Sequence, residues 1–204
     1  DTEVAAVVGE VARAMDELGH DVGAPPPAVN GEALMDAYAV LTTLGIAGVF
    51  DEHEQVGDDR LEQVTLAVLD EARRLNAYRI ARGFQAADAV TEGLRRYFDD
   101  VDLLVTPTLA RLPAPHGALD YDRPGYSVRS WLRSIFEYGP FTEPFNLGGQ
   151  PAISLPLGQS ASGLPVGVQL VAAEGREDLL LQVAAALEER FPWSSRRPPV
   201  HVAG

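Results

Sequence analysis

The spacing of apolar residues changes once along this chain, near residue 101, and that change limits the folds open to it. Before it, apolar side chains recur every three or four residues in three stretches, 2–18, 31–44 and 58–97. After it come three short apolar runs, 101–105, 152–157 and 166–172. The first spacing predicts amphipathic helices and the short runs predict strands. Because helices come before and after the strands, the sequence predicts an α/β fold in layers.

Local signals place the ends of the first helices. Thr2 is a candidate N-cap for the first helix and Gly19 a stop signal. Asn30 is placed to cap the second helix. The third helical pattern runs from about residue 58 toward residue 97, and Gly83 or Gly93 offers a break in it.

The second half of the chain alternates loops with short elements. Residues 113–125 are rich in Pro, Gly and Asp and predict a loop, whereas 127–138 predict an amphipathic helix. Residues 140–151 predict a further loop. The runs 152–157 and 166–172 are joined by a polar connector and predict a hairpin, and a last helix follows at 177–191.

Composition excludes several classes of function. The 204 residues carry 16 basic against 30 acidic side chains, for a net charge of −14, which argues against a nucleic-acid or membrane-surface partner. All 16 basic residues are arginine, so the chain by itself cannot use a lysine base or a lysine Schiff base. It has no cysteine, which excludes disulfides and fits a cytoplasmic protein. The apolar stretch 33–50 is interrupted by polar residues, so we expect it not to span a membrane.

General motifs of catalysis and metal binding are weak here. The four histidines have no i, i+4 pair, and we interpret them as exposed loop residues: His20, His53, His116 and His201. The acidic patch around Glu52 and Glu54 reads as a solvated loop, and no metal or cofactor is expected. None of the serines lies in a Gly-x-Ser-x-Gly turn, and Ser154 is expected in the middle of a strand.

One segment is far more specific. Residues 141–156 read FTEPFNLGGQPAISLP, and residues 163–171 read GLPVGVQLV. Together with DLLVTPT at 102–108 and EDLLL at 177–181, they resemble in order and spacing the C-terminal part of the amidase signature family. Residues 31–96 match the family only in helical character. Residues 175–193 look closest to the branch of the family that contains nylon-oligomer hydrolases.

The resemblance implies a fold and a chemistry. The fold is an α/β/α sandwich around a mixed β-sheet, of which residues 1–204 would be the C-terminal portion of a single amidase domain. The family hydrolyses carboxylic amides through an acyl-enzyme, with a neutral lysine, a bridging serine and a nucleophilic serine. This chain has no lysine and no Gly-Gly-Ser-Ser-Gly segment. We therefore expect no catalytic residue on it and no activity from it alone.

The partner classes follow from the same resemblance. They are a small-molecule amide substrate and the N-terminal part of the same enzyme, with a homodimer left open. Two alternatives also remain: a noncatalytic binding or scaffold module with this fold, and part of a glutamine-dependent amidotransferase subunit. The reading frame upstream of Asp1 separates a hydrolase from a module, because only the hydrolase needs an upstream lysine and double-serine segment.

The resemblance also implies that this region forms one wall of the substrate site. The candidates are Phe145, Asn146, Gly149 and Gln150 on the glycine-rich segment. Glycine there allows a close backbone approach, and an Asn side chain both donates and accepts hydrogen bonds. Tyr38 and Thr42, spaced i, i+4, are candidates for the facing side. Two alternatives stay open: the segment only supports the sheet, and the i, i+4 pair belongs to an ordinary packed helix face.

Overall fold

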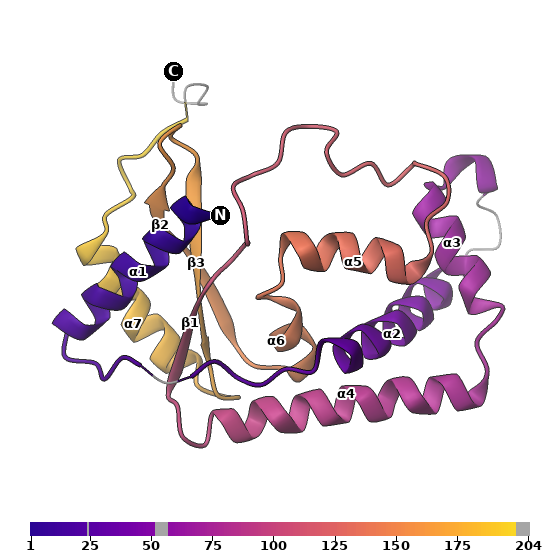
Figure 1. Ribbon diagram of the computed structural model, residues 1–204, viewed down its shortest axis with the longest axis horizontal. Coiled ribbons are helices and arrows are strands. Elements are labelled where there is room, and N and C mark those ends of the chain that lie inside the picture. The colour runs from indigo at the N-terminus through magenta and orange to yellow at the C-terminus, as the bar shows by residue number, and fades with distance from the viewer. Residues whose placement is uncertain (24, 52–56, 199–204) are drawn as a thin grey trace. The chain divides into compact units, whose positions relative to one another are not determined.

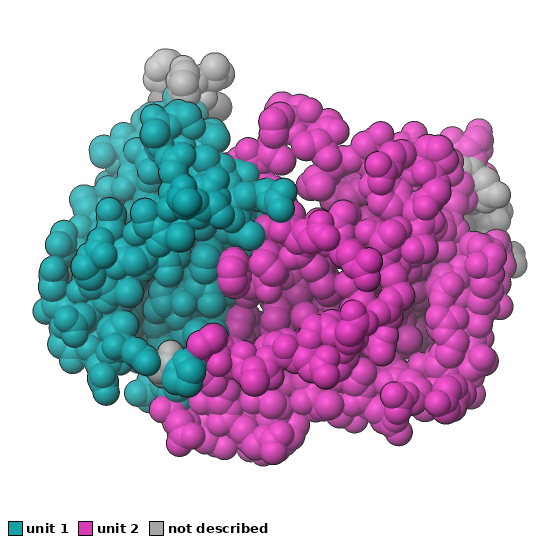
Figure 2. Space-filling model, viewed as in Figure 1, with its two compact units in different colours: residues 1–25, 101–112, 150–204 teal, residues 26–100, 113–149 magenta. Residues whose placement is uncertain are grey.

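The structure is a computed structural model that describes residues 1–23, 25–51 and 57–198 (Figure 1). The chain divides into two compact units (Figure 2). Unit 1 combines Asp1–Pro25, Val101–Leu112 and Gln150–Gly204, and unit 2 combines Pro26–Asp100 and Pro113–Gly149. That all 204 residues belong to one amidase domain stays a prediction.

Unit 1 contains a three-stranded sheet. Strand β3 (Pro165–Ala172) lies between β1 (Leu103–Pro107) and β2 (Ala152–Gln159), and both pairs are antiparallel. Leu103 lies opposite Ala172, so β1 pairs with a segment distant in sequence. The hairpin of β2 and β3 confirms the sequence-based expectation. Helices and strands together confirm the α/β class.

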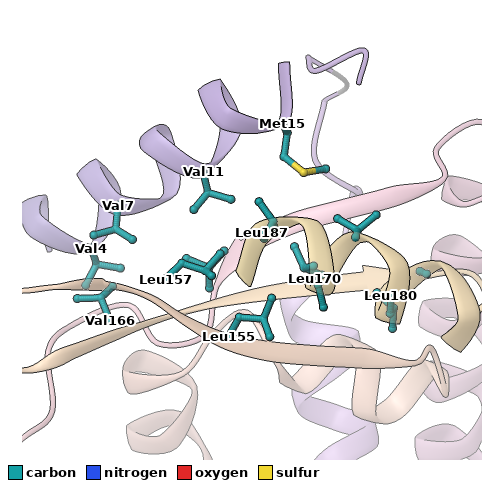
Figure 3. Close-up of a cluster of buried hydrophobic side chains, with 14 residues drawn as sticks. Val4, Val7, Val11, Met15, Leu155, Leu157, Val166, Leu170, Leu180 and Leu187 are labelled. Carbon is teal, nitrogen blue, oxygen red and sulfur yellow. The ribbon is translucent and has the colours of Figure 1, made fainter. Parts of the chain in front are cut away.

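Two helices, α1 (Thr2–Glu17) and α7 (Glu177–Arg190), pack on the sheet through one buried cluster (Figure 3). Because side chains alternate along a strand, every second residue of β3 points into this cluster. Aliphatic groups fill it: Val4, Val7, Val11, Met15, Leu155, Leu157, Val166, Val168, Leu170, Ala172, Leu180, Val183, Ala184 and Leu187. Burying a side chain of the Val or Leu type contributes about 1.5–3 kcal/mol, so this cluster is the main stabilising contact of unit 1.

A glycine sets how closely α1 approaches the sheet. A Cβ built on Gly158 would lie 2.4 Å from Cγ2 of Val7. The register of β2 on β3 shifts between Leu155 and Gly158, which marks a β-bulge. The guanidinium of Arg196 donates to the carbonyl oxygens of Pro156 and Gly158 at 2.8 and 3.3 Å. The carbonyl of Pro156 lies in the irregular stretch, and its bond to Arg196 gives it a partner outside the ladder.

The first helix begins one residue away from the expected cap. Asp1, not Thr2, is the N-cap: its carboxylate accepts a hydrogen bond from the backbone N–H of Glu3 at 2.8 Å. Both residue types can cap a helix, and the carboxylate also interacts favourably with the positive end of the helix dipole. The expected stop is confirmed, since Gly19 follows the helix with φ of +93°.

Unit 2 is helical in its described residues. Helix α2 packs on α3, α4 and α5, and α6 packs on α4. The elements are α2 (Gly31–Asp51), a 3-10 turn (Asp58–Arg60), α3 (Gln63–Ala72), α4 (Ala77–Tyr97), α5 (Val128–Tyr138) and α6 (Glu143–Gly148). The cap of α2 is confirmed, because the side chain of Asn30 accepts from the N–H groups of Glu32 and Ala33, both at 3.1 Å. The expected helix at 127–138 is confirmed with Ser127 as its N-cap.

Two expectations for unit 2 are wrong. The long third helix is two helices, and the break lies before Asn76, which caps α4, and not at Gly83 or Gly93. Gly83 lies inside α4 because a larger side chain would meet Val40, with 2.6 Å from its Cβ to that of Val40. The expected loop 140–151 contains α6, whose start is favoured by a proline in its first turn.

Helix α2 also bears on the expectation about membranes. Residues Gly31–Phe50 have a mean hydropathy of 1.6, long and apolar enough by length and composition to cross a membrane. By this measure the expectation that 33–50 is too polar is wrong. A single such helix is weak evidence for a membrane, because core helices pass the same test. Of that window, 28% is buried, and α2 contacts three other helices of unit 2.

Candidate functional site

The structure brings together two helices of unit 2 that carry candidate residues. Tyr38 lies on α2 and Asn146 on α6. The hydroxyl of Tyr38 donates a hydrogen bond to the backbone carbonyl of Glu143, with 2.8 Å between the two oxygens. The ring of Tyr38 meets that of Phe136 edge to face, with 5.1 Å between the centroids. Tyr38 is therefore a fixed link between α2 and the first turn of α6.

This link keeps the phenol protonated. Burial of the Tyr38 hydroxyl is the largest cause of a pKa raised to about 12, and the negative charge of Glu143 adds to it. A hydrogen bond with the side chain of Asn146 lowers the pKa in part. Tyr38 is thus a hydrogen-bond donor at neutral pH, in the neighbourhood of Asn146.

Glu143 is a residue that the sequence analysis did not single out. Its side chain is buried, with 8% exposed, and burial raises the pKa of its carboxyl above the usual value. The hydroxyl of Thr142 lies 3.2 Å from Oε2 and donates to it. The described residues place no arginine in an ion pair with this carboxylate. In the sequence, Glu143 is marked only by the proline that follows it, and this pattern does not indicate burial.

The other candidates of unit 2 differ in exposure. Phe145 is 5% exposed and belongs to the interior, whereas Asn146 is exposed on the same short helix. Thr42 is half-buried one turn after Tyr38 on α2. Gly149 ends α6 with φ of +77°, and its N–H donates to the carbonyl of Phe145 at 2.9 Å. Asn146 and Gly149 are the members of the set best placed to meet a ligand.

Gln150 falls in unit 1, directly before β2. Its side-chain oxygen is buried and finds no hydrogen-bond partner among the residues that the structure describes. Buried polar atoms nearly always have a hydrogen-bond partner, so this oxygen needs a donor. An N–H or O–H group from another segment or from a ligand would satisfy it.

A second polar group lies on the sheet of unit 1. The hydroxyls of Thr108 and Ser154 are 2.6 Å apart, and Nε2 of Gln169 donates to Oγ1 of Thr106 at 3.1 Å. Gly167 leaves room for them, since a Cβ there would lie 2.8 Å from Oγ1 of Thr108. Ser154 is in mid-strand, as expected, and its hydroxyl has a partner. The group forms only when β1 and β2 both pair with β3, because its members are far apart in sequence.

The side chains gathered here are hydrogen-bonding groups: a phenol, a carboxyl, amides and hydroxyls. The chain has no lysine and no cysteine, and Tyr38 is held as a neutral donor. Within residues 1–23, 25–51 and 57–198, no three His, Asp or Glu side chains gather into a group that could hold a metal ion. His20 and His116 are exposed, while His53, His201, Glu52 and Glu54 lie outside the described residues.

Comparisons with known proteins identify the family. Residues 1–181 match the family model described as Amidase. The 6-aminohexanoate-cyclic-dimer hydrolase of Paenarthrobacter ureafaciens is 37% identical over 97% of this chain and 42% of its own length. A putative amidase, AmiB2, of Mycobacterium tuberculosis is 34% identical over 96% of this chain and 41% of its own length. The chain thus spans less than half the length of these relatives.

A solved structure agrees with the sequence match. The structure of a 6-aminohexanoate cyclic dimer hydrolase superposes with a TM-score of 0.87 at 34% identity, over 98% of this chain and 43% of that one. The matched family model, the curated relatives and this fold all point the same way, and they confirm the resemblance found in residues 141–171. The chain belongs to the amidase signature family.

Proposed function

We propose that this chain is the C-terminal part of an enzyme that hydrolyses carboxylic amides to a carboxylate and an amine. The observation that carries the proposal is the match of nearly the whole chain to amide hydrolases. The 6-aminohexanoate cyclic dimer, after which these relatives are named, is the first compound to test. The role of the chain is to supply fold and one wall of the substrate site, because it carries no lysine to act as the family's base.

The proposal assigns the lysine and both serines to an N-terminal part. We expect the isolated 204-residue chain to lack amidase activity, by several orders of magnitude relative to the complete protein, because nucleophile and base act as a unit. The measurement is release of amine from 6-aminohexanoate cyclic dimer, aliphatic amides and anilides. Turnover by the isolated chain that survives re-purification would contradict the assignment. A complete protein inactive on every amide would favour a noncatalytic module.

Asn146 is the side chain proposed to contact the substrate. It is exposed on α6 and its side chain hydrogen-bonds the Tyr38 hydroxyl, so its amide can meet a substrate while Tyr38 fixes its position. We expect Asn146→Ala in the complete protein to change KM or the relative kcat/KM within an amide panel and to leave the thermal midpoint nearly unchanged. A lowered midpoint with unchanged relative specificity would assign Asn146 to support of the fold. Asp88→Asn, exposed on α4, is the matched surface control.

The proposal also includes a location and an excluded class of partner. Lack of cysteine supports a cytoplasmic enzyme. The net charge of −14 argues against a nucleic-acid partner.

A further inference from the structure

Unit 2 contains a cavity apart from Asn146 and Tyr38. Its volume is about 300 Å³, the lower end of the range usual for small-molecule sites. Four helices line it: α2, α3, α4 and the start of α5. Charged groups of both signs and aliphatic groups share the lining, which is the mixture that binds small polar molecules with an apolar part.

Two of the three arginines of the cavity are already engaged. Arg79 pairs with Glu71, across the gap between α3 and α4. Arg129, at the start of α5, pairs with Asp36 and with Glu32, the latter at 2.9 Å. These pairs fix the walls of the cavity and neutralise its carboxylates.

The third arginine, Arg82, has no partner among the described residues. Arg82 lines the cavity from α4, and within the described part of the chain its guanidinium makes no ion pair or hydrogen bond. Tyr78, 73% exposed, lies one turn earlier on the same helix and also lines the cavity. In a chain with net charge −14, an unpaired guanidinium at the mouth of a cavity is a local site for an anion.

The aliphatic part of the lining adds a second requirement. Val40 and Val128 are 7% and 3% exposed, and the side chain of Ala39 lies beside them in the lining. The lining as a whole is more apolar than polar, so a ligand with an apolar part contacts more of it than an inorganic anion does. Because Arg129 and Arg79 already neutralise the carboxylates of Asp36 and Glu71, the one guanidinium left over matches a single negative charge on the ligand.

We propose that this cavity binds a small organic monocarboxylate, with the carboxylate on the guanidinium of Arg82 and the apolar part against Val40 and Val128. The planar fork of a guanidinium matches the two oxygens of a carboxylate. The inference does not depend on the proposed amidase activity, since binding is measured without turnover.

The test uses the natural protein that carries this chain and four probes at constant ionic strength. Hexanoate is the expected ligand, hexanamide has the same shape without charge, hexylamine has the opposite charge, and inorganic phosphate has charge without an apolar part. Calorimetry should show that hexanoate binds more tightly than the other three. Arg82→Gln should weaken hexanoate binding about tenfold, the usual effect of losing a charged hydrogen bond. Arg82→Glu should abolish it.

Arg133→Gln is the matched control, because Arg133 is also exposed in unit 2, on α5, and does not line the cavity. Thermal midpoints of all variants should agree, since both arginines are exposed. Several outcomes would overturn the proposal: no hexanoate binding by the folded protein, equal binding of hexanamide or phosphate, or equal losses from Arg82→Gln and Arg133→Gln.

Discussion

The two units of this chain both bury aliphatic side chains, and they differ in one buried ionisable group. Unit 1 joins α1, α7 and the sheet through one continuous aliphatic cluster. Unit 2 also buries apolar side chains, among them a cluster of Met35, Val68, Val128 and Leu132, and it holds Glu143, the one buried carboxyl among the described residues. Aliphatic packing stabilises a fold, whereas a buried ionisable group opposes folding unless it is neutral or well paired. The comparison places the one buried carboxyl, with the cost of burying its charge, in unit 2 beside Tyr38.

The largest effect should come from the core of unit 1. Leu170 is fully buried at the centre of the sheet, so Leu170→Ala should lower the free energy of unfolding by about 2–5 kcal/mol. Leu181→Ala is the control, because Leu181 on α7 is 64% exposed and should change stability by less than about 0.5 kcal/mol. Denaturant unfolding measures both. Equal effects would show that the aliphatic cluster does not dominate the stability of unit 1.

An intermediate effect is expected where helices of unit 2 touch. Gly83→Ala places a Cβ at 2.6 Å from that of Val40, so it should destabilise the protein by about 1–3 kcal/mol. Gly93→Ala on the same helix meets nothing within 4 Å and should stabilise by up to about 1 kcal/mol, because alanine favours helices. Opposite shifts of the thermal midpoint are the expected result. Two shifts of the same sign would refute the close contact of α2 and α4.

The smallest effect comes from the charge of Glu143, which makes the stability of unit 2 depend on pH. Burial raises the pKa of Glu143, so the folded state binds its proton more tightly than the unfolded state. The contribution of Glu143 to the free energy of unfolding is fully present below the pKa of the unfolded state, about 4.3. It is lost as the pH rises through the pKa of the folded state. Glu143→Gln, which mimics the protonated form, should therefore raise the midpoint at pH 7 and lose that advantage near pH 4.

The exposed Glu10→Gln on α1 is the control for this pair of measurements and should leave the pH dependence unchanged. A variant at Glu143 that is less stable than the parent at pH 7 would mean that the carboxylate is well paired after all.

The sequence predicted unit 1 better than unit 2, for physical reasons. Strands β2 and β3 show in the sequence because their apolar runs are bounded by proline and glycine. The break before Asn76 was missed because Leu75 and Tyr78 keep the helical spacing and no proline or glycine marks the gap. Helix α6 was missed because its six residues are too few to show a period of 3.6.

The candidate site was predictable only in part. Tyr38 and Asn146 were named, and the structure brings them to one place. Glu143 and the unpaired oxygen of Gln150 were not, because burial and hydrogen-bond partners depend on which elements pack together. The same is true of Thr108 and Ser154, whose contact depends on each pairing with β3.

The pairing of β1 with β3 has a consequence for how the chain matures during synthesis. Unit 2 is complete when Gly149 leaves the ribosome, but β1 gains its neighbour only when residues 165–172 follow. Until then the backbone groups of β1 that bond β3 lack these partners, and α1 lacks its contacts with β2 and β3. We expect unit 2 to become resistant to protease on a nascent chain before unit 1 does, because α1 and β1 gain their partners only when residues 150–204 have been made.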